Sequence, residues 1–187
     1  MTIKAMLMRG AVLAVGIALA APAQAAVSDG SYVDAGGARV LRETVTVDAP
    51  RDAVWRAFTT SAGMARWTVP VVQVTPGNGG LIEFALRPDG RIGDADNVRN
   101  RIDVFLPDEL LVFHNEFVPA GGPFDPATFG TVRTLLSFDA AEGGRTRVTQ
   151  TVVGFGAGAN YDRLYAHLKD GNAEYLAALA DSFARKN

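Results

Sequence analysis

The side chains that most often carry catalysis or bind metals are sparse in this chain. Its 187 residues include two histidines, His114 and His167, and no cysteine. There is no His-x-x-x-His pattern and no Gly-x-Ser-x-Gly motif, which removes the common signatures of a zinc site and of a nucleophilic serine. The glycine-rich stretches 77–80 and 154–158 lack the lysine of a phosphate-binding loop. We therefore expect no metal and no cofactor, and an enzyme is the less favoured interpretation.

The elements that must position any site are mostly strands. A period-two alternation of apolar and polar residues predicts a strand at 38–47 and six more from residue 71 onward. The connections carry Gly, Pro, Asp and Asn, which is typical of turns between antiparallel neighbours. The six later segments are 71–75, 81–86, 98–106, 110–117, 131–138 and 146–153.

Helical spacing follows the first strand and returns at the C-terminus. A helix is expected over 48–58 with Asp48 as its N-cap, and a second, short one over 61–67. From about residue 160 a long helix is expected, with a kink or break at Asp170-Gly171-Asn172. The predicted fold is α+β: a curved seven-stranded antiparallel sheet, two short helices after its first strand, and a long C-terminal helix over its concave face.

Four neutral polar residues share the apolar faces of the last four strands. Side chains alternate across a strand, so the more apolar face is assigned to the interior. Pairing across the 139–145 turn sets Thr134 close to opposite Gln150, and Asn100 and Asn115 lie at a similar height. A buried amide without a partner costs about 1 to 3 kcal/mol, so water or a ligand would satisfy this polar belt. Alternatively, its members bond one another, or the face assignment slips at a bulge.

A carboxylate lies on the interior face of the first strand. Glu43 shares that face with Leu41, Val45 and Val47. It is either an inward carboxylate or in contact with solvent, because this strand begins near a free arm.

The stretch 118–130, VPAGGPFDPATFG, is predicted to be an irregular loop, because its prolines and glycines disfavour both helix and strand. Phe124 is the candidate for the tip of a lid over the mouth of a cavity, and Phe129 for packing against that mouth on the hinge side of the lid. The alternative is that both plug that end permanently.

Four stretches resemble a known superfamily: 47–58 (VDAPRDAVWRAF), 65–67 (ARW), 79–90 (GGLIEFALRPDG) and 106–113 (LPDELLVF). With the predicted element order, they resemble the START-like, helix-grip superfamily, also called SRPBCC. Within it the chain is most similar to the branch named after the activator of the heat-shock protein 90 ATPase. The resemblance covers roughly residues 38 to 185 and implies the fold. It does not imply one activity, because members include lipid and hormone carriers, polyketide cyclases, oxygenase subunits and co-chaperones.

Two positions depart from that branch. Members often carry a second tryptophan directly after the one that matches Trp67, where this chain has Thr68. They also often carry a Gly-Trp pair in the last helix, where this chain has Gly171-Asn172. Loss of two bulky aromatics leaves room inside unless other groups fill it, which favours an internal cavity.

The expected ligand is therefore a small hydrophobic or amphipathic molecule, bound by a carrier or sensor between the sheet and the last helix. A cyclase or dehydrase, in which water, the belt and a tyrosine or His167 steer proton transfer, is one alternative. A packed protein-interaction module is another. The residues expected to contact the ligand are Asn100, Asn115, Thr134, Gln150, Phe113, Phe117, Phe124, Phe129, Tyr161 and Leu164.

The first 25 residues have the layout of a secretory signal. Lys4 and Arg9 precede an apolar run from 11 to 21, and Ala23-Gln24-Ala25 fits the small-residue cleavage rule. We therefore expect a secreted protein, periplasmic if its source is Gram-negative, which suits a cytosolic co-chaperone poorly.

The mature chain is expected to consist of a flexible arm at 26–37 and a START-like domain at 38–187. Its net charge falls from −2 to −4, because the leader removes Lys4 and Arg9. An acidic chain without a basic stripe does not suit nucleic acid. No cysteine offers a lipid anchor and no later apolar run reaches the roughly 18 residues of a membrane span, so no stable membrane anchor is expected. The oligomeric state is left open.

Overall fold

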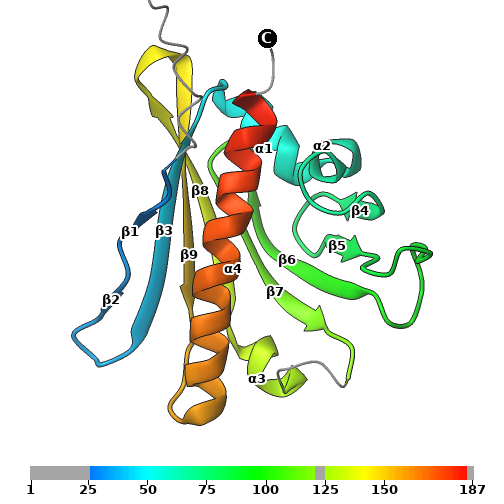
Figure 1. The fold of residues 1–187 in the computed structure, drawn as a ribbon, viewed down its shortest axis with the longest axis vertical. Helices are drawn as coiled ribbons and strands as arrows, with labels where there is room; N and C mark the ends of the chain where they lie inside the picture. Colours follow the sequence, from blue (N-terminus) through cyan, green and yellow to red (C-terminus); the bar gives the residue numbers. More distant parts are fainter. Residues whose placement is uncertain (1–25, 121–124, 185–187) are drawn as a thin grey trace, which may run out of the picture.

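The computed structural model describes residues 26–120 and 125–184, which form a curved antiparallel sheet with a long helix across its concave face (Figure 1). The strand order is β1-β3-β9-β8-β7-β6-β5-β4, and β2 also pairs with β3. The expected leader, 1–25, lies outside the described residues. The strands are β1 (Ser28–Asp29), β2 (Tyr32–Val33), β3 (Arg39–Val47), β4 (Val72–Thr75), β5 (Leu81–Phe84), β6 (Val98–Leu106), β7 (Leu110–Phe117), β8 (Arg133–Ala141) and β9 (Arg145–Val153).

The helices are α1 (Arg51–Thr59), α2 (Ser61–Ala65), α3 (Pro126–Thr131) and α4 (Ala159–Ala184), with a short 3-10 turn η1 (Glu142–Gly144) between β8 and β9. The predicted helix-grip fold is confirmed, with all seven expected strands present. The sheet has nine strands rather than seven, because β1 and β2 form within the expected arm. Backbone pairing of Ser28 with Thr44 and of Tyr32 with Val40 holds them on β3.

The first two helices share one junction residue. Thr60 ends α1, where its Oγ1 donates to the Arg56 carbonyl at 2.8 Å, and the same oxygen accepts the Gly63 N–H at 3.0 Å to start α2. The N-cap of α1 is Pro50, not Asp48 as predicted. The prolyl ring fixes φ near the value of −68° that this position has.

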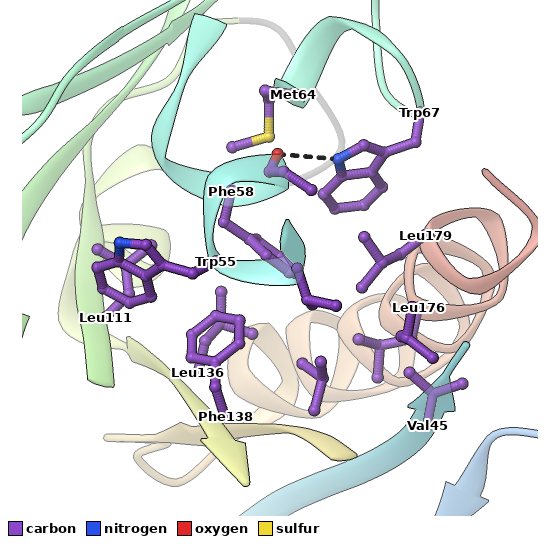
Figure 2. Packing of buried hydrophobic residues seen from close by; sticks show 14 of the residues in the cluster. Val45, Trp55, Phe58, Met64, Trp67, Leu111, Leu136, Phe138, Leu176 and Leu179 are labelled. Carbon is purple, nitrogen blue, oxygen red and sulfur yellow. Dashed lines mark hydrogen bonds between the residues drawn. The ribbon is translucent and has the colours of Figure 1, made fainter. Parts of the chain in front are cut away.

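The larger apolar cluster lies where α1, α2 and the C-terminal half of α4 meet the sheet (Figure 2). The rings of Trp55 and Phe58 pack edge-on against Phe138 of β8, with centroids 5.2 and 5.4 Å away. The indole N–H of Trp67 donates to the Ala57 carbonyl at 3.0 Å. These contacts join α1 to the sheet and the segment after α2 to α1, so they fix this end of the grip.

The last helix is continuous from Ala159 to Ala184, so the expected kink or break at residues 170–172 is wrong. Gly171 lies on the exposed side of α4 and Asn172 turns inward. A mid-helix glycine costs roughly 1 kcal/mol relative to alanine. Burial of apolar side chains such as Leu164, Leu176 and Leu179 against the sheet outweighs this cost.

Irregular pairing in β6 changes which of its side chains face the interior. The register with β7 shifts between Ile102 and Val104, as happens at a β-bulge. Phe105 then packs against the larger cluster while Leu106 is exposed. Strict alternation from Asn100 and Ile102 would turn Val104 and Leu106 inward, but it does not survive the shift.

A short helix, α3, occupies part of the stretch that was predicted to be an irregular loop. Asp125 is its N-cap, since a carboxylate oxygen accepts the Thr128 N–H at 3.0 Å, and Pro126 takes the first helical position. The Asp-Pro pair is thus a helix start rather than a turn. Phe124, the predicted tip of the lid, lies outside the described residues.

The β5–β6 connection folds back over the outer face of the sheet. Glu83 lies on that outer face and is buried beneath the connection. Its carboxylate accepts the Gly93 N–H at 2.7 Å and the Asn97 side-chain N–H at 2.6 Å. The connection is therefore held by hydrogen bonds to an outward-facing side chain, which the alternation pattern could not reveal.

Candidate functional site

The four residues of the predicted polar belt do not form one continuous group. Asn100 and Asn115 lie opposite each other on β6 and β7, as expected, and Asn115 Nδ2 donates to Asn100 Oδ1 at 2.7 Å. Thr134 does not face Gln150: it pairs with Val152, whereas Gln150 pairs with Leu136. The pairing is therefore shifted by two residues from the prediction, and Gln150 lies diagonally from Thr134 on the same face.

Gln150 belongs to another polar group, with Glu43 of β3 and Asn172 of α4. Their exposed fractions are 5, 2 and 9 %. Three of their atoms, Gln150 Oε1, Glu43 Oε2 and Asn172 Nδ2, are buried without a hydrogen-bond partner within the described chain. We call these three residues the buried polar layer.

Strand register places two members of the layer side by side. Glu43 and Gln150 are direct partners across β3 and β9. Directly opposed residues of an antiparallel pair point to the same face, with Cβ atoms about 5 Å apart. Both side chains face α4, because their neighbours along the strands, Val45 and Val148, belong to the larger apolar cluster.

The layer separates the two apolar clusters of the molecule. On β3, β9 and α4, each polar residue of the layer lies between an apolar residue of the smaller cluster and one of the larger cluster. Residues two apart on a strand, or four apart on a helix, point to the same side, so the three side chains share one face. The smaller cluster includes Leu41, Val152 and Leu164, with Leu168 packed against it, and the larger one includes Val45, Val148 and Leu176. The flanked triplets are Leu41-Glu43-Val45, Val148-Gln150-Val152 and Leu168-Asn172-Leu176.

Burial raises the pKa of the Glu43 carboxyl from 4.5 to about 7. The negative charge of the neighbouring Asp29 also raises the pKa of Glu43, and the positive charge of Lys169 lowers it. The charge of Asp170 raises this pKa by a smaller amount than Asp29 does. Two of these groups lie on α4, which places that part of the helix beside Glu43. This carboxyl therefore keeps its proton to a higher pH than an ordinary glutamate, and in its protonated form it can donate a hydrogen bond as well as accept one.

An ion pair borders the layer at the edge of the sheet. Asp29 of β1 is the register partner of Glu43, and its carboxylate lies 2.7 Å from the Lys169 ammonium on α4. The pair keeps the pKa of Asp29 well below its ordinary value and raises that of Lys169. β1 is therefore tied to both the sheet and the helix directly outside Glu43.

The other predicted ligand residues lie toward α3. Phe113 packs beside the larger cluster, and Phe129 and Tyr161 pack with Leu164 in the smaller one. The Tyr161 hydroxyl lies 3.2 Å from Thr131 Oγ1 at the end of α3. Phe117 pairs with Arg99, whose guanidinium carbon lies 4.2 Å from the centre of its ring. Phe117 is thus placed with Arg99 rather than with the buried polar layer.

The inner face of β7 and β8 is less covered than that of their neighbours. Phe113, Asn115 and Thr134 are only half-buried, whereas Leu111 and Leu136 are fully buried. Phe113 pairs with Thr134, which lies diagonally from Gln150. On the concave face, half-buried residues on β7 and β8 therefore lie next to the buried polar layer, which begins on the adjacent strand β9.

Two layer residues were not among the predicted ligand contacts. Glu43 had a signal, because a carboxylate shared a face with three aliphatic residues, but its burial depends on β1, which the sequence did not predict. Asn172 had a signal as well, since it stands where the related branch often has a tryptophan. Its inward direction could not be deduced while the helix was expected to break there.

Other clusters of functional side chains lie elsewhere. On the outer face of the sheet, His114 Nδ1 is 2.9 Å from the Asp103 carboxylate, which also pairs with Arg133 Nε at 3.1 Å. Within residues 26–120 and 125–184, no three His, Cys, Asp or Glu side chains form a group able to hold a metal ion. No helix in these ranges has the length and apolarity to cross a membrane.

The fold and the internal layer define a helix-grip α+β protein. A family model described as Activator of Hsp90 ATPase homolog 1-like protein matches residues 48–184, and the chain belongs to this family. The branch expected from the sequence is thereby confirmed. Among curated proteins no match is found.

Solved structures share the fold at low identity. Protein MLL2253 from Mesorhizobium loti has a TM-score of 0.61 and 17% identity, over 80% of this chain and 99% of that one. The Aha1 dimer from Colwellia psychrerythraea has a TM-score of 0.57 and 18% identity, over 77% of this chain and 95% of that one. CalU16 from Micromonospora echinospora has a TM-score of 0.58 and 19% identity, over 86% of this chain and 87% of that one. At this level of identity, the similarities show that the fold is shared.

Proposed function

We propose that this protein binds a small amphipathic molecule between the sheet and α4, with the polar end of the molecule at the buried polar layer. The observation that carries the proposal is the set of three buried, unpartnered atoms on Glu43, Gln150 and Asn172. Each such atom costs about 1 to 3 kcal/mol if it stays unsatisfied. A ligand that supplies the missing partners recovers this energy, so the layer favours occupation by a polar group.

The apolar part of the ligand has a surface to lie on. Phe113 and Thr134 face the concave side but are half-buried, and Thr134 is diagonal to Gln150. A molecule with its polar end at Gln150 would extend over these two side chains toward Asn115. Apolar contact there contributes roughly 25 cal/mol per Å² removed from water.

Native mass spectrometry and thermal shift test the proposal. Protein purified from its own compartment, and then protein mixed with fatty acids, sterols and aromatic polyketides, should show a bound mass and a raised melting temperature for at least one class. Gln150→Leu should abolish that binding. Gln73→Leu is the matched control, since Gln73 lies on the exposed side of β4. An empty mass and no shift with any class would exclude the proposed function.

A further inference from the structure

We propose that the buried polar layer accepts the uncharged carbonyl–hydroxyl group of an otherwise apolar molecule, and that Glu43 makes this binding depend on pH. The inference rests on the proposed function and specifies the chemistry of its ligand. It follows from the types of unpartnered atom that the layer offers and from the charges around them.

The layer offers a matched set of donors and acceptors. Asn172 Nδ2 is an unpartnered donor and Gln150 Oε1 an unpartnered acceptor. Glu43 Oε2 donates when its carboxyl is protonated. A ligand carbonyl oxygen can accept from Glu43 and Asn172 while a neighbouring ligand hydroxyl donates to Gln150. A hydroxyketone or an enolised diketone carries both groups on adjacent or near-adjacent carbons.

The charges around Glu43 disfavour an anionic head group. On the β1 side lies Asp29, and on the α4 side lie Lys169 and Asp170. Lys169 is already paired with Asp29 at 2.7 Å, and β9 contributes the neutral Gln150. A carboxylate placed in the layer would therefore meet no free cation from these elements, and burying it unpaired is costly.

Protonation of Glu43 sets the sign of the pH dependence. The pKa of Glu43 in the folded protein is about 7, so the donor form dominates below that value. Ionised Glu43 repels the carbonyl oxygen that protonated Glu43 binds. Affinity should be constant at acidic pH and then fall by up to about tenfold per pH unit above about pH 7.

Isothermal titration with a medium-chain α-hydroxyketone tests the inference, because this probe carries no charge over the range used. We expect the affinity of the wild-type protein to fall by about tenfold or more between about pH 6 and pH 8.5. Glu43→Gln should bind the probe with little pH dependence, since the glutamine amide donates at every pH. Glu174→Gln, on the exposed side of α4, is the matched control and should keep the wild-type profile.

The outcomes separate this inference from the proposed function. Binding of the hydroxyketone with the same pH profile in the wild-type and Glu43→Gln proteins overturns the role of Glu43. Binding of fatty acids or sterols in the layer, without the hydroxyketone at any pH, overturns the head-group class but leaves the proposed function intact. Absence of binding across the whole panel overturns both.

Discussion

Glu43 and Gln150 lie directly opposite each other on β3 and β9, and each has one buried oxygen without a hydrogen-bond donor. Two acceptors side by side cannot satisfy each other unless one of them carries a proton. Together with Asn172 on the facing helix, this relationship makes the level between the two apolar clusters energetically unfavourable as long as its polar atoms lack partners. It also makes the stability of this level sensitive to pH and to a bound polar group.

The first prediction concerns stability against pH. The pKa of Glu43 rises from 4.5 to about 7 on folding, so the folded state holds its proton more tightly than the unfolded state. The contribution of Glu43 is most favourable below about pH 4.5, declines as pH rises to about 7, and is constant above. Because a tenfold change in proton affinity corresponds to about 1.4 kcal/mol, Glu43→Gln should gain about 2 to 3 kcal/mol relative to wild type between about pH 4.5 and pH 8.

Urea unfolding at a series of pH values measures this gain. Glu174→Gln provides the control and should follow the wild-type curve. A constant difference between Glu43→Gln and wild type across the range would mean that folding does not raise the pKa of Glu43, which would contradict the prediction.

The second prediction contrasts two amides. Gln150→Leu removes an unpartnered buried oxygen, so it should leave stability unchanged or raise it by about 1 kcal/mol. Asn115→Leu removes the donor to Asn100 Oδ1 and should cost about 1 to 3 kcal/mol. Thermal or urea unfolding of the two variants gives the comparison. Equal losses in both would indicate that Gln150 is satisfied in solution.

The fold was predictable because it depends on local patterns. The strands now labelled β6 and β7 were placed at their observed bounds, since alternation and turn residues agree there. Phe105 and the continuous α4 were missed because a bulge and a packed helix depend on contacts distant in sequence. The two-residue strands β1 and β2 are too short for any periodicity to appear.

The candidate site was predictable only in part. Gln150 and the Asn100–Asn115 pair follow from face assignment alone. On one side Gln150 pairs with Leu136 rather than with Thr134, and on the other side it pairs with Glu43. Both pairings depend on strand register, which the alternation of side chains does not determine. To predict that Asn172 points inward, one must know that the helix is unbroken and which of its faces lies against the sheet. Neither composition nor residue spacing determines this.

The third prediction concerns the ion pair outside Glu43. Asp29 raises the pKa of Glu43 and Lys169 lowers it. Asp29→Asn should therefore lower that pKa, whereas Lys169→Met should raise it. Titration of the Glu43 side-chain carboxyl carbon by NMR measures both changes. Changes of the same sign in the two variants would contradict the arrangement of these charges around Glu43.

The fourth prediction separates a lid from a plug at the α3 end. Phe129 packs with Tyr161 and Leu164 in the smaller cluster, so Phe129→Ala should cost about 2 to 4 kcal/mol of stability. Tyr161→Phe removes only the hydroxyl that lies 3.2 Å from Thr131 Oγ1 and should cost about 1 kcal/mol or less. Urea unfolding and ligand exchange rates are measured on both variants. A large stability loss in Phe129→Ala makes this residue a plug, whereas faster exchange at unchanged stability makes it the hinge of a lid.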